Sequence, residues 1–186
     1  MKKFLPVIIV LLMASGASAI TDISAGVYGG LNAPLVQQDA KSGMGFGFKV
    51  KVTPIPFVGG AAFFESRNFG DPEVKILEGT PNELTVKTDG GKVSVLGIEA
   101  LIGAPGGGIG PHFYWSFGLA NYKWTRTGYS KLSKMGYHTG PGLEIVFPAG
   151  FGVGAQAKFE IVPTGNGGSR KNVLGFIGLN YHFGLL

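Results

Sequence analysis

Four charged residues at alternating positions are the side chains of this sequence best placed for polar chemistry. Lys49 and Lys51 alternate with large apolar residues in the stretch MGFGFKVKV (44–52), and Glu99 and Glu144 stand between apolar residues in two other stretches. Ammonium and carboxylate groups that are removed from water must pair, because burying an isolated charge is costly. The sequence therefore predicts a layer of ion pairs wherever these four residues share an interior.

The candidates for catalysis are weaker. The chain has three histidines, His112, His138 and His182, and none is followed by a serine two positions later. His112 and Ser116 share a face, but four residues of a strand separate them by about 13 Å. A general base must lie within hydrogen-bond reach of its nucleophile. We predict no catalytic residue.

Metal and phosphate signals are also weak. The sequence contains no cysteine, and its histidines lack the spacing of zinc ligands. The glycine-rich stretch GGGIGP (106–111) lacks the following Lys-Ser/Thr pair of a phosphate-binding loop, and residues 71–92 lack the alternating Asp/Asn pattern of a calcium loop. We predict neither a metal nor a cofactor.

Basic residues gather in two polar connections near the C-terminal half of the chain. The first connection, residues 123–135, has no acidic residue, whereas the loop 67–92 before it is rich in acids. One interpretation is solvation and pairing between neighbouring loops. The other is a basic rim that binds anionic lipid head groups, because charge-assisted contacts to phosphate are strong. The rim would consist of Lys123, Arg126, Lys131, Lys134, Arg170 and Lys171.

Eight stretches with two different faces must position these residues. Each alternates apolar and polar or small side chains, which is the pattern of a β-strand. The facing of the stretch 57–66 stays ambiguous, because GGAAFF interrupts its alternation. The eight stretches are 23–32, 44–52, 57–66, 92–103, 112–122, 136–146, 151–161 and 172–183.

The alternation indicates that the apolar faces point outward. The opposite faces are rich in glycine, which fits a narrow interior better than a solvated surface. Short connections (53–56, 104–111 and 148–150) alternate with longer polar ones, as in outer-membrane barrels whose short turns lie in the periplasm. Aromatic residues near the short turns would form an interfacial girdle: Phe57, Phe113, Trp115, Phe147, Phe151, Tyr181 and Phe183.

These features predict an all-β fold, a transmembrane eight-stranded antiparallel up-and-down β-barrel. The alternative is a soluble periplasmic carrier of the lipocalin type, with the apolar faces inside. In the membrane barrel, Lys49, helped by Lys51, would bridge Glu99 and Glu144 in one buried layer that plugs the lumen. Each charge could otherwise reach periplasmic water separately.

The N-terminus reads as a secretory signal peptide over residues 1–19, followed by a barrel domain over 20–186. Lys2 and Lys3 precede an apolar run that is too short to span a bilayer, and Ala17-Ser18-Ala19 forms a small-residue cleavage site. The two leader lysines contribute to the formal net charge of +5. The basic charge is therefore weak evidence for nucleic acid, and we predict no nucleic-acid partner.

From SAGVYGGLNAP (24–34) to GFIGLNYHF (175–183), the chain resembles the small eight-stranded outer-membrane barrels, such as OmpX or the membrane domain of OmpA. The resemblance implies a bacterial outer-membrane location. It also implies that the barrel assembly machinery recognises the C-terminal strand through Phe183, although the chain continues into Gly184-Leu185-Leu186. The expected role is structural, lipopolysaccharide-binding or surface-interacting. A narrow pore and a lipid-modifying barrel enzyme are the alternatives.

Overall fold

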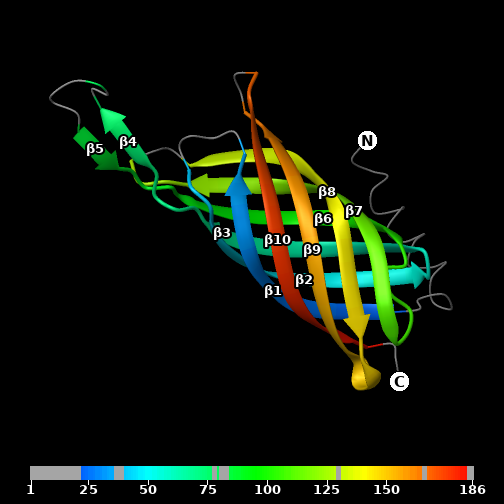
Figure 1. The fold of residues 1–186 in the computed structure, drawn as a ribbon. Coiled ribbons are helices and arrows are strands. Elements are labelled where there is room, and N and C mark those ends of the chain that lie inside the picture. Colours follow the sequence, from blue (N-terminus) through cyan, green and yellow to red (C-terminus); the bar gives the residue numbers. More distant parts are fainter. Residues whose placement is uncertain are drawn as a thin grey trace.

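The chain forms a closed antiparallel barrel in a computed structural model that describes residues 22–35, 40–76, 79, 84–128, 131–164 and 167–183. Around the barrel the strand order is β1-β10-β9-β8-β7-β6-β3-β2, and β4 and β5 form a separate two-stranded hairpin that projects away from it (Figure 1). The elements are β1 (Asp22–Pro34), β2 (Gly43–Ile55), β3 (Val58–Asn68), β4 (Glu73–Ile76), β5 (Leu84–Lys87), β6 (Lys92–Gly103), β7 (Gly110–Thr125), β8 (Leu132–Val146), η1 (Pro148–Gly150), β9 (Phe151–Pro163) and β10 (Ser169–His182).

The barrel closes where its first strand meets its last. In the β1–β10 seam, eleven consecutive pairs, from Ser24–His182 to Pro34–Asn172, join the two strands in one register. The connections β2–β3, β6–β7 and β8–β9 lie at the same end of the barrel as Ser24, which we call the turn side. The opposite end, which carries the β4–β5 hairpin, is the loop side.

The barrel is apolar outside and charged inside, which confirms the predicted fold class. In β2, Phe46 is 65% exposed, whereas its neighbours Gly45 and Gly47 are buried. The same alternation resolves the ambiguous stretch 57–66, because Phe63 and Glu65 face the interior. A lipocalin would show the reverse pattern. All seven aromatic residues predicted for the girdle are substantially exposed on the outer surface or at the turn side.

The inward glycines make room for large side chains in the lumen. A β-carbon at Gly118 would lie 2.3 Å from the His138 ring, and one at Gly142 would lie 2.2 Å from the Tyr114 ring. Such contacts are far shorter than any van der Waals separation. At Gly118 and Gly142, glycine is therefore required by the filling of a narrow interior.

Several connections differ from the sequence expectation. The connection 104–109 on the turn side is as long as 126–131 on the loop side, so the difference in length comes mainly from the connection 69–91. VKIL and LTVK in this connection supply most of β4 and β5. A proline inside β8 suggests a bulge, but Thr139–Phe159 and Gly142–Gln156 keep one register across it.

Two predicted features lie outside the described residues. They are the signal peptide (1–19) and the C-terminal extension (184–186). Across the described ranges, no helix has the length and hydropathy needed to cross a bilayer.

Candidate functional site in the charged interior

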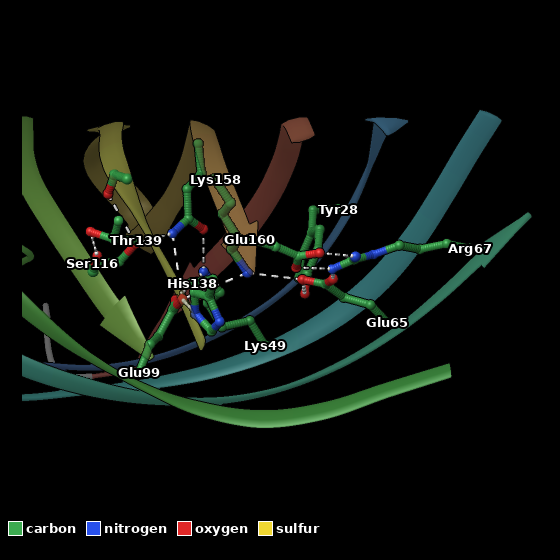
Figure 2. A network of polar contacts seen from close by, with 12 residues as sticks. Tyr28, Lys49, Glu65, Arg67, Glu99, Ser116, His138, Thr139, Lys158 and Glu160 are labelled. Atoms are coloured by element: carbon green, nitrogen blue, oxygen red, sulfur yellow. Dashed lines mark hydrogen bonds and ion pairs between the residues drawn. The ribbon is translucent and has the colours of Figure 1, made fainter. Parts of the chain in front are cut away.

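A central cluster of polar side chains occupies the middle of the lumen. Lys49 Nζ lies 2.5 Å from Glu99 Oε1 and donates a hydrogen bond to Gln156 Oε1, also at 2.5 Å. His138 Nε2 lies 3.1 Å from Glu99 Oε2. Gln156 in turn donates to the Ser116 hydroxyl at 2.9 Å. These side chains come from β2, β6, β7, β8 and β9, so the cluster ties most of the barrel wall together (Figure 2).

A turn-side cluster fills the lumen near the turn side. Lys51 Nζ bonds to the Glu144 carboxylate and to the Pro105 carbonyl oxygen at 2.7 Å. The His182 ring lies between two carboxylates, with Nδ1 2.7 Å from Asp22 and Nε2 3.0 Å from Glu144. His182 therefore joins β1 to β8 through polar contacts with both carboxylates.

A loop-side cluster is the most deeply buried of the three. The Arg67 guanidinium bonds to Glu160 through two nitrogens, at 2.6 and 2.7 Å, and also to the Glu65 carboxylate. Tyr28 donates to Glu65 at 2.7 Å. Tyr122 donates to Glu160 at 3.1 Å. Bidentate contacts of this kind hold arginine in a fixed geometry. The barrel interior thus contains an arginine held between two glutamates.

Lys158 connects the loop-side and central clusters. Its ammonium lies 2.9 Å from Glu65 Oε1 and 3.6 Å from Glu99 Oε2. It also lies 4.0 Å from the centre of the Phe63 ring, close enough for a cation–π interaction. Figure 2 shows the resulting chain of contacts from Arg67 to Glu99.

Apolar side chains fill much of the remaining interior near the loop side. A buried core, with Trp124 partly buried against it, lies beside the loop-side cluster. A small void of about 40 Å³ separates the central and turn-side clusters, with Lys49, Lys51 and Tyr114 in its wall. A void of this size holds about one or two water molecules. The core consists of Phe63, Val93, Val95, Ala120, Tyr122 and Val162.

The four residues that the sequence singled out all face the interior, but they form two pairs. Lys49 meets Glu99, and Lys51 meets Glu144 one step nearer the turn side. Glu144 also receives a hydrogen bond from Asn180 Nδ2 at 2.6 Å. The expected single layer is therefore split in two. Facing along each strand does not fix the depth of a side chain in the lumen, because barrel strands are tilted and staggered relative to one another.

The residues that sequence reasoning missed belong mainly to the loop-side cluster. Glu65 and Arg67 follow the ambiguous GGAAFF segment, so their facing was uncertain. Lys158 and Glu160 share the parity of Gln156 in β9, and this alternation is the signal that could have identified them. His138 contacts Glu99 in the central cluster, a partner that the sequence alone did not indicate.

The histidines have partners other than serine. His112 Nε2 lies 2.8 Å from the Gly108 carbonyl oxygen, and His138 and His182 contact carboxylates. The Ser116 hydroxyl donates to the Gly140 carbonyl oxygen. None of these contacts joins a hydroxyl to an imidazole. Within the described ranges, no grouping of His, Asp and Glu side chains has the arrangement of a metal site.

The six predicted rim residues lie in three different settings. Two, Lys123 and Lys171, occupy outward positions at the loop-side ends of β7 and β10. Arg126 and Lys131 lie in the β7–β8 connection, where Arg126 donates to Thr88 Oγ1 at 3.3 Å. Lys134 and Arg170 have the inward parity of their strands, and the Arg170 guanidinium lies 5.8 Å from the Trp124 ring centre.

One carboxylate links two loops on the loop side. Asp89 accepts hydrogen bonds from the backbone N–H and the hydroxyl of Thr127, at 2.9 and 2.7 Å, and from the Gly91 N–H at 2.8 Å. These donors, with the Thr127 backbone foremost, lower the pKa of Asp89 to about 2. The contact holds the β3–β6 and β7–β8 connections together.

The chain has the fold of small eight-stranded outer-membrane barrels. It is similar to the N-terminal β-barrel domain of Pseudomonas aeruginosa OprF, with 16% identity, a TM-score of 0.56, and coverage of 88% of this chain and 98% of that one. Neisserial surface protein A gives 11% identity, a TM-score of 0.57, and coverage of 88% and 97%. Yersinia pestis Ail, solved with the heparin analogue sucrose octasulfate, gives 16% identity and a TM-score of 0.50, with coverage of 87% of this chain and 97% of that one. No protein-family model and no curated protein matches the sequence.

Proposed function

We propose that this protein is an integral outer-membrane protein with a sealed lumen and a structural or surface-interacting role. It would reach the membrane through the signal peptide at residues 1–19 and the barrel assembly machinery. The observation that carries the proposal is the inverted barrel: apolar side chains cover the wall, while paired charges fill the interior. A bilayer is the environment in which such an exterior is stable.

The filled interior favours a plug over a pore. Arg67, Lys158 and Glu160 are at most 1% exposed, and their contacts reach across the lumen between strands that are far apart in sequence. Water-filled channels belong to barrels with more strands, whereas an eight-stranded interior is just wide enough for side chains to fill. The void of about 40 Å³ between the central and turn-side clusters is too small for a solute.

Electrical recording tests the sealed lumen. The purified protein in a planar bilayer should give no steady conductance, and a stable open channel would favour the narrow pore.

Lys49→Met should destabilise the barrel well beyond a surface change, because it leaves the Glu99 carboxylate without its nearest cation. A Lys49→Met barrel as stable as the parent would contradict a structural role for the central cluster.

Location is tested separately. The protein should fractionate with outer membranes and migrate faster on a gel when unboiled than when boiled. Recovery in the soluble periplasmic fraction would favour a carrier of the lipocalin type.

The enzyme alternative has its own assay, which is mass spectrometry of cellular lipids after expression. New or missing lipid species would contradict the proposal that the protein is not an enzyme.

Binding of lipopolysaccharide is the surface interaction that the charge distribution supports. Six basic residues lie at or above the loop-side ends of the strands, where they would meet anionic lipid head groups. Neutralising the four in and beside the β7–β8 connection should weaken binding without unfolding the barrel. The effect should shrink with rising salt, because exposed charges are screened within about 10 Å at 0.1 M.

A further inference from the structure

The outer wall over β3, β6, β7 and β8 becomes polar before the strands end. Strand registers place Ser66 opposite Ser94, Ser94 opposite Lys123, and Lys123 opposite Ser133. These four residues thus form one continuous row across four strands, and all have the outward parity. A row of three hydroxyls and one ammonium is unusual on a surface that is apolar over most of its height.

A second lysine lies diagonally above the first. Lys92 pairs with Thr125, and Ser94 pairs with Lys123, so the two lysines are diagonal neighbours at about 7–8 Å. Neither lysine makes a polar side-chain contact with another described residue. Both ammonium groups are therefore available to a single ligand.

The outward charges of the barrel strands are all positive. Among the described residues of the eight barrel strands, the charged side chains on the outward parity are Lys92, Lys123 and Lys171. The carboxylates of the barrel strands instead have the inward parity. An anion that approaches this wall meets no opposing negative charge from it.

The described residues of the opposite wall form no comparable polar row. Leu31 in β1 lies three residues from the loop-side end of its strand, and Val173 in β10 lies four residues from its end. Asn121 occupies the corresponding position in β7, four residues from Thr125. The polar surface therefore extends further toward the membrane on one side of the barrel than on the other.

A shallow hollow lies where the polar row meets the apolar wall. Its volume is about 320 Å³. Phe64 and Leu96 supply an apolar floor, while Ser94, Asn121 and Lys123 supply polar groups. Asn121 is oriented by a hydrogen bond from the Ser133 hydroxyl at 2.9 Å. One polar edge and one apolar edge match an amphipathic ligand.

We propose that this wall patch, formed by Ser66, Lys92, Ser94, Asn121, Lys123 and Ser133, binds the phosphorylated head group of an outer-leaflet lipid. The inference rests on the proposed outer-membrane location. The two ammonium groups bind the phosphate, and the hydroxyl and amide groups bond to head-group oxygens. An acyl chain lies against Phe64 and Leu96. The binding site is the side wall of the barrel, and Lys92 belongs to it.

Binding of lipopolysaccharide to matched double variants tests the wall patch. The full protein is titrated into fluorescently labelled lipopolysaccharide in a zwitterionic detergent, and anisotropy gives the Kd. Lys92→Gln/Lys123→Gln should weaken binding about thirtyfold at low salt, since each lysine near an anionic lipid surface contributes to affinity. Removing the phosphates from the lipid should give a similar loss with the parent protein. The control Lys41→Gln/Lys87→Gln removes two exposed lysines outside both the patch and the basic rim and should bind like the parent.

The outcomes separate this inference from the proposed function. Equal binding by the patch variant and the parent would overturn the wall patch, as would an equal loss in the control variant. Full binding of the dephosphorylated lipid would overturn the role of phosphate. In each case, faster migration without boiling and fractionation with outer membranes would show that the barrel and its location still hold. Recovery of the parent as a soluble protein would instead overturn the proposed function itself.

Discussion

Arg67 is the residue whose removal should destabilise the interior most. Its guanidinium neutralises both Glu65 and Glu160 in a site from which water is excluded. Arg67→Met would leave two buried carboxylates facing each other, and of these two only Glu65 contacts Lys158. We expect the free energy of unfolding to fall by about 3–5 kcal/mol. Urea unfolding in lipid vesicles measures this change.

The control for Arg67 is Lys87→Met in the β4–β5 hairpin, whose side chain is 76% exposed. Exposed pairs contribute little, so this variant should unfold like the parent. Equal stability of the Arg67→Met variant and the parent would mean that the loop-side cluster does not hold the barrel together.

Asp89 provides a pH-dependent contact outside the membrane. Its pKa of about 2 lies below the ordinary 3.8, so the ionised carboxylate stabilises the loop contact at any pH above about 4. This contribution is lost as the pH falls toward 2. NMR of ¹³C-labelled aspartate should give a midpoint near 2 for Asp89. Thr127→Val, which removes only the hydroxyl donor, should move the midpoint part of the way toward 3.8. A parent midpoint near 3.8 would contradict the contact.

At the level of single residues, the sequence predicted facing better than depth. Strict alternation gave the correct parity for Lys49, Lys51, Glu99 and Glu144, because a strand has only two faces. Which charge meets which depends on the stagger between strands, and no single strand carries that information. The partnership of Arg67 with Glu160, which are 93 positions apart, was out of reach for the same reason.

At the level of the element, β9 offers the cleanest test of inside and outside. Ala155 faces outward near the middle of the strand, so Ala155→Arg places a charge in the hydrocarbon layer. We expect a loss of about 2–4 kcal/mol in urea unfolding from vesicles. Thr125→Arg, also outward but at the loop-side end of β7, should cost much less. The opposite order of these two losses would place the bilayer elsewhere on the wall.

Gln156, the inward neighbour of Ala155, is a poor control for this comparison. It contacts Lys49 and Ser116 in a filled interior, so an arginine there would meet both crowding and like charge. Strand parity alone predicts that a charge at an inward position costs less stability than one at an outward position. Because the closed barrel fills the interior around Gln156, an arginine there need not be milder than an arginine at Ala155.

Strand existence was the most predictable feature at this scale. Each of the eight expected stretches overlaps one barrel strand, and 92–103 coincides with β6. The stretch 57–66 was ambiguous because small residues on both parities remove the contrast between faces. Its facing follows from the pairing of β3 with β2 and β6, which is tertiary information.

For the whole molecule, the His182–Asp22 contact tests how the barrel is closed. A double-mutant cycle with Asp22→Asn and His182→Asn should show a coupling of about 0.5–3 kcal/mol, because the two side chains are in direct contact at 2.7 Å. Additive losses would show that the seam depends on its backbone pairing alone. The same cycle on Lys41 and Glu73, an exposed pair at 3.8 Å, supplies the baseline.

The seam also constrains the order of folding. Asp22 and His182 are 160 positions apart, so the contact that completes the barrel is among the most non-local that this chain can make. A chain that lacks β10 would leave the pairing edge of β1 open, and open edges recruit other chains. Loop closure over such a distance is slow, and β-sheet proteins of high contact order fold slowly. β10 is thus the strand that covers the open edges of β1 and β9 and removes their aggregation hazard.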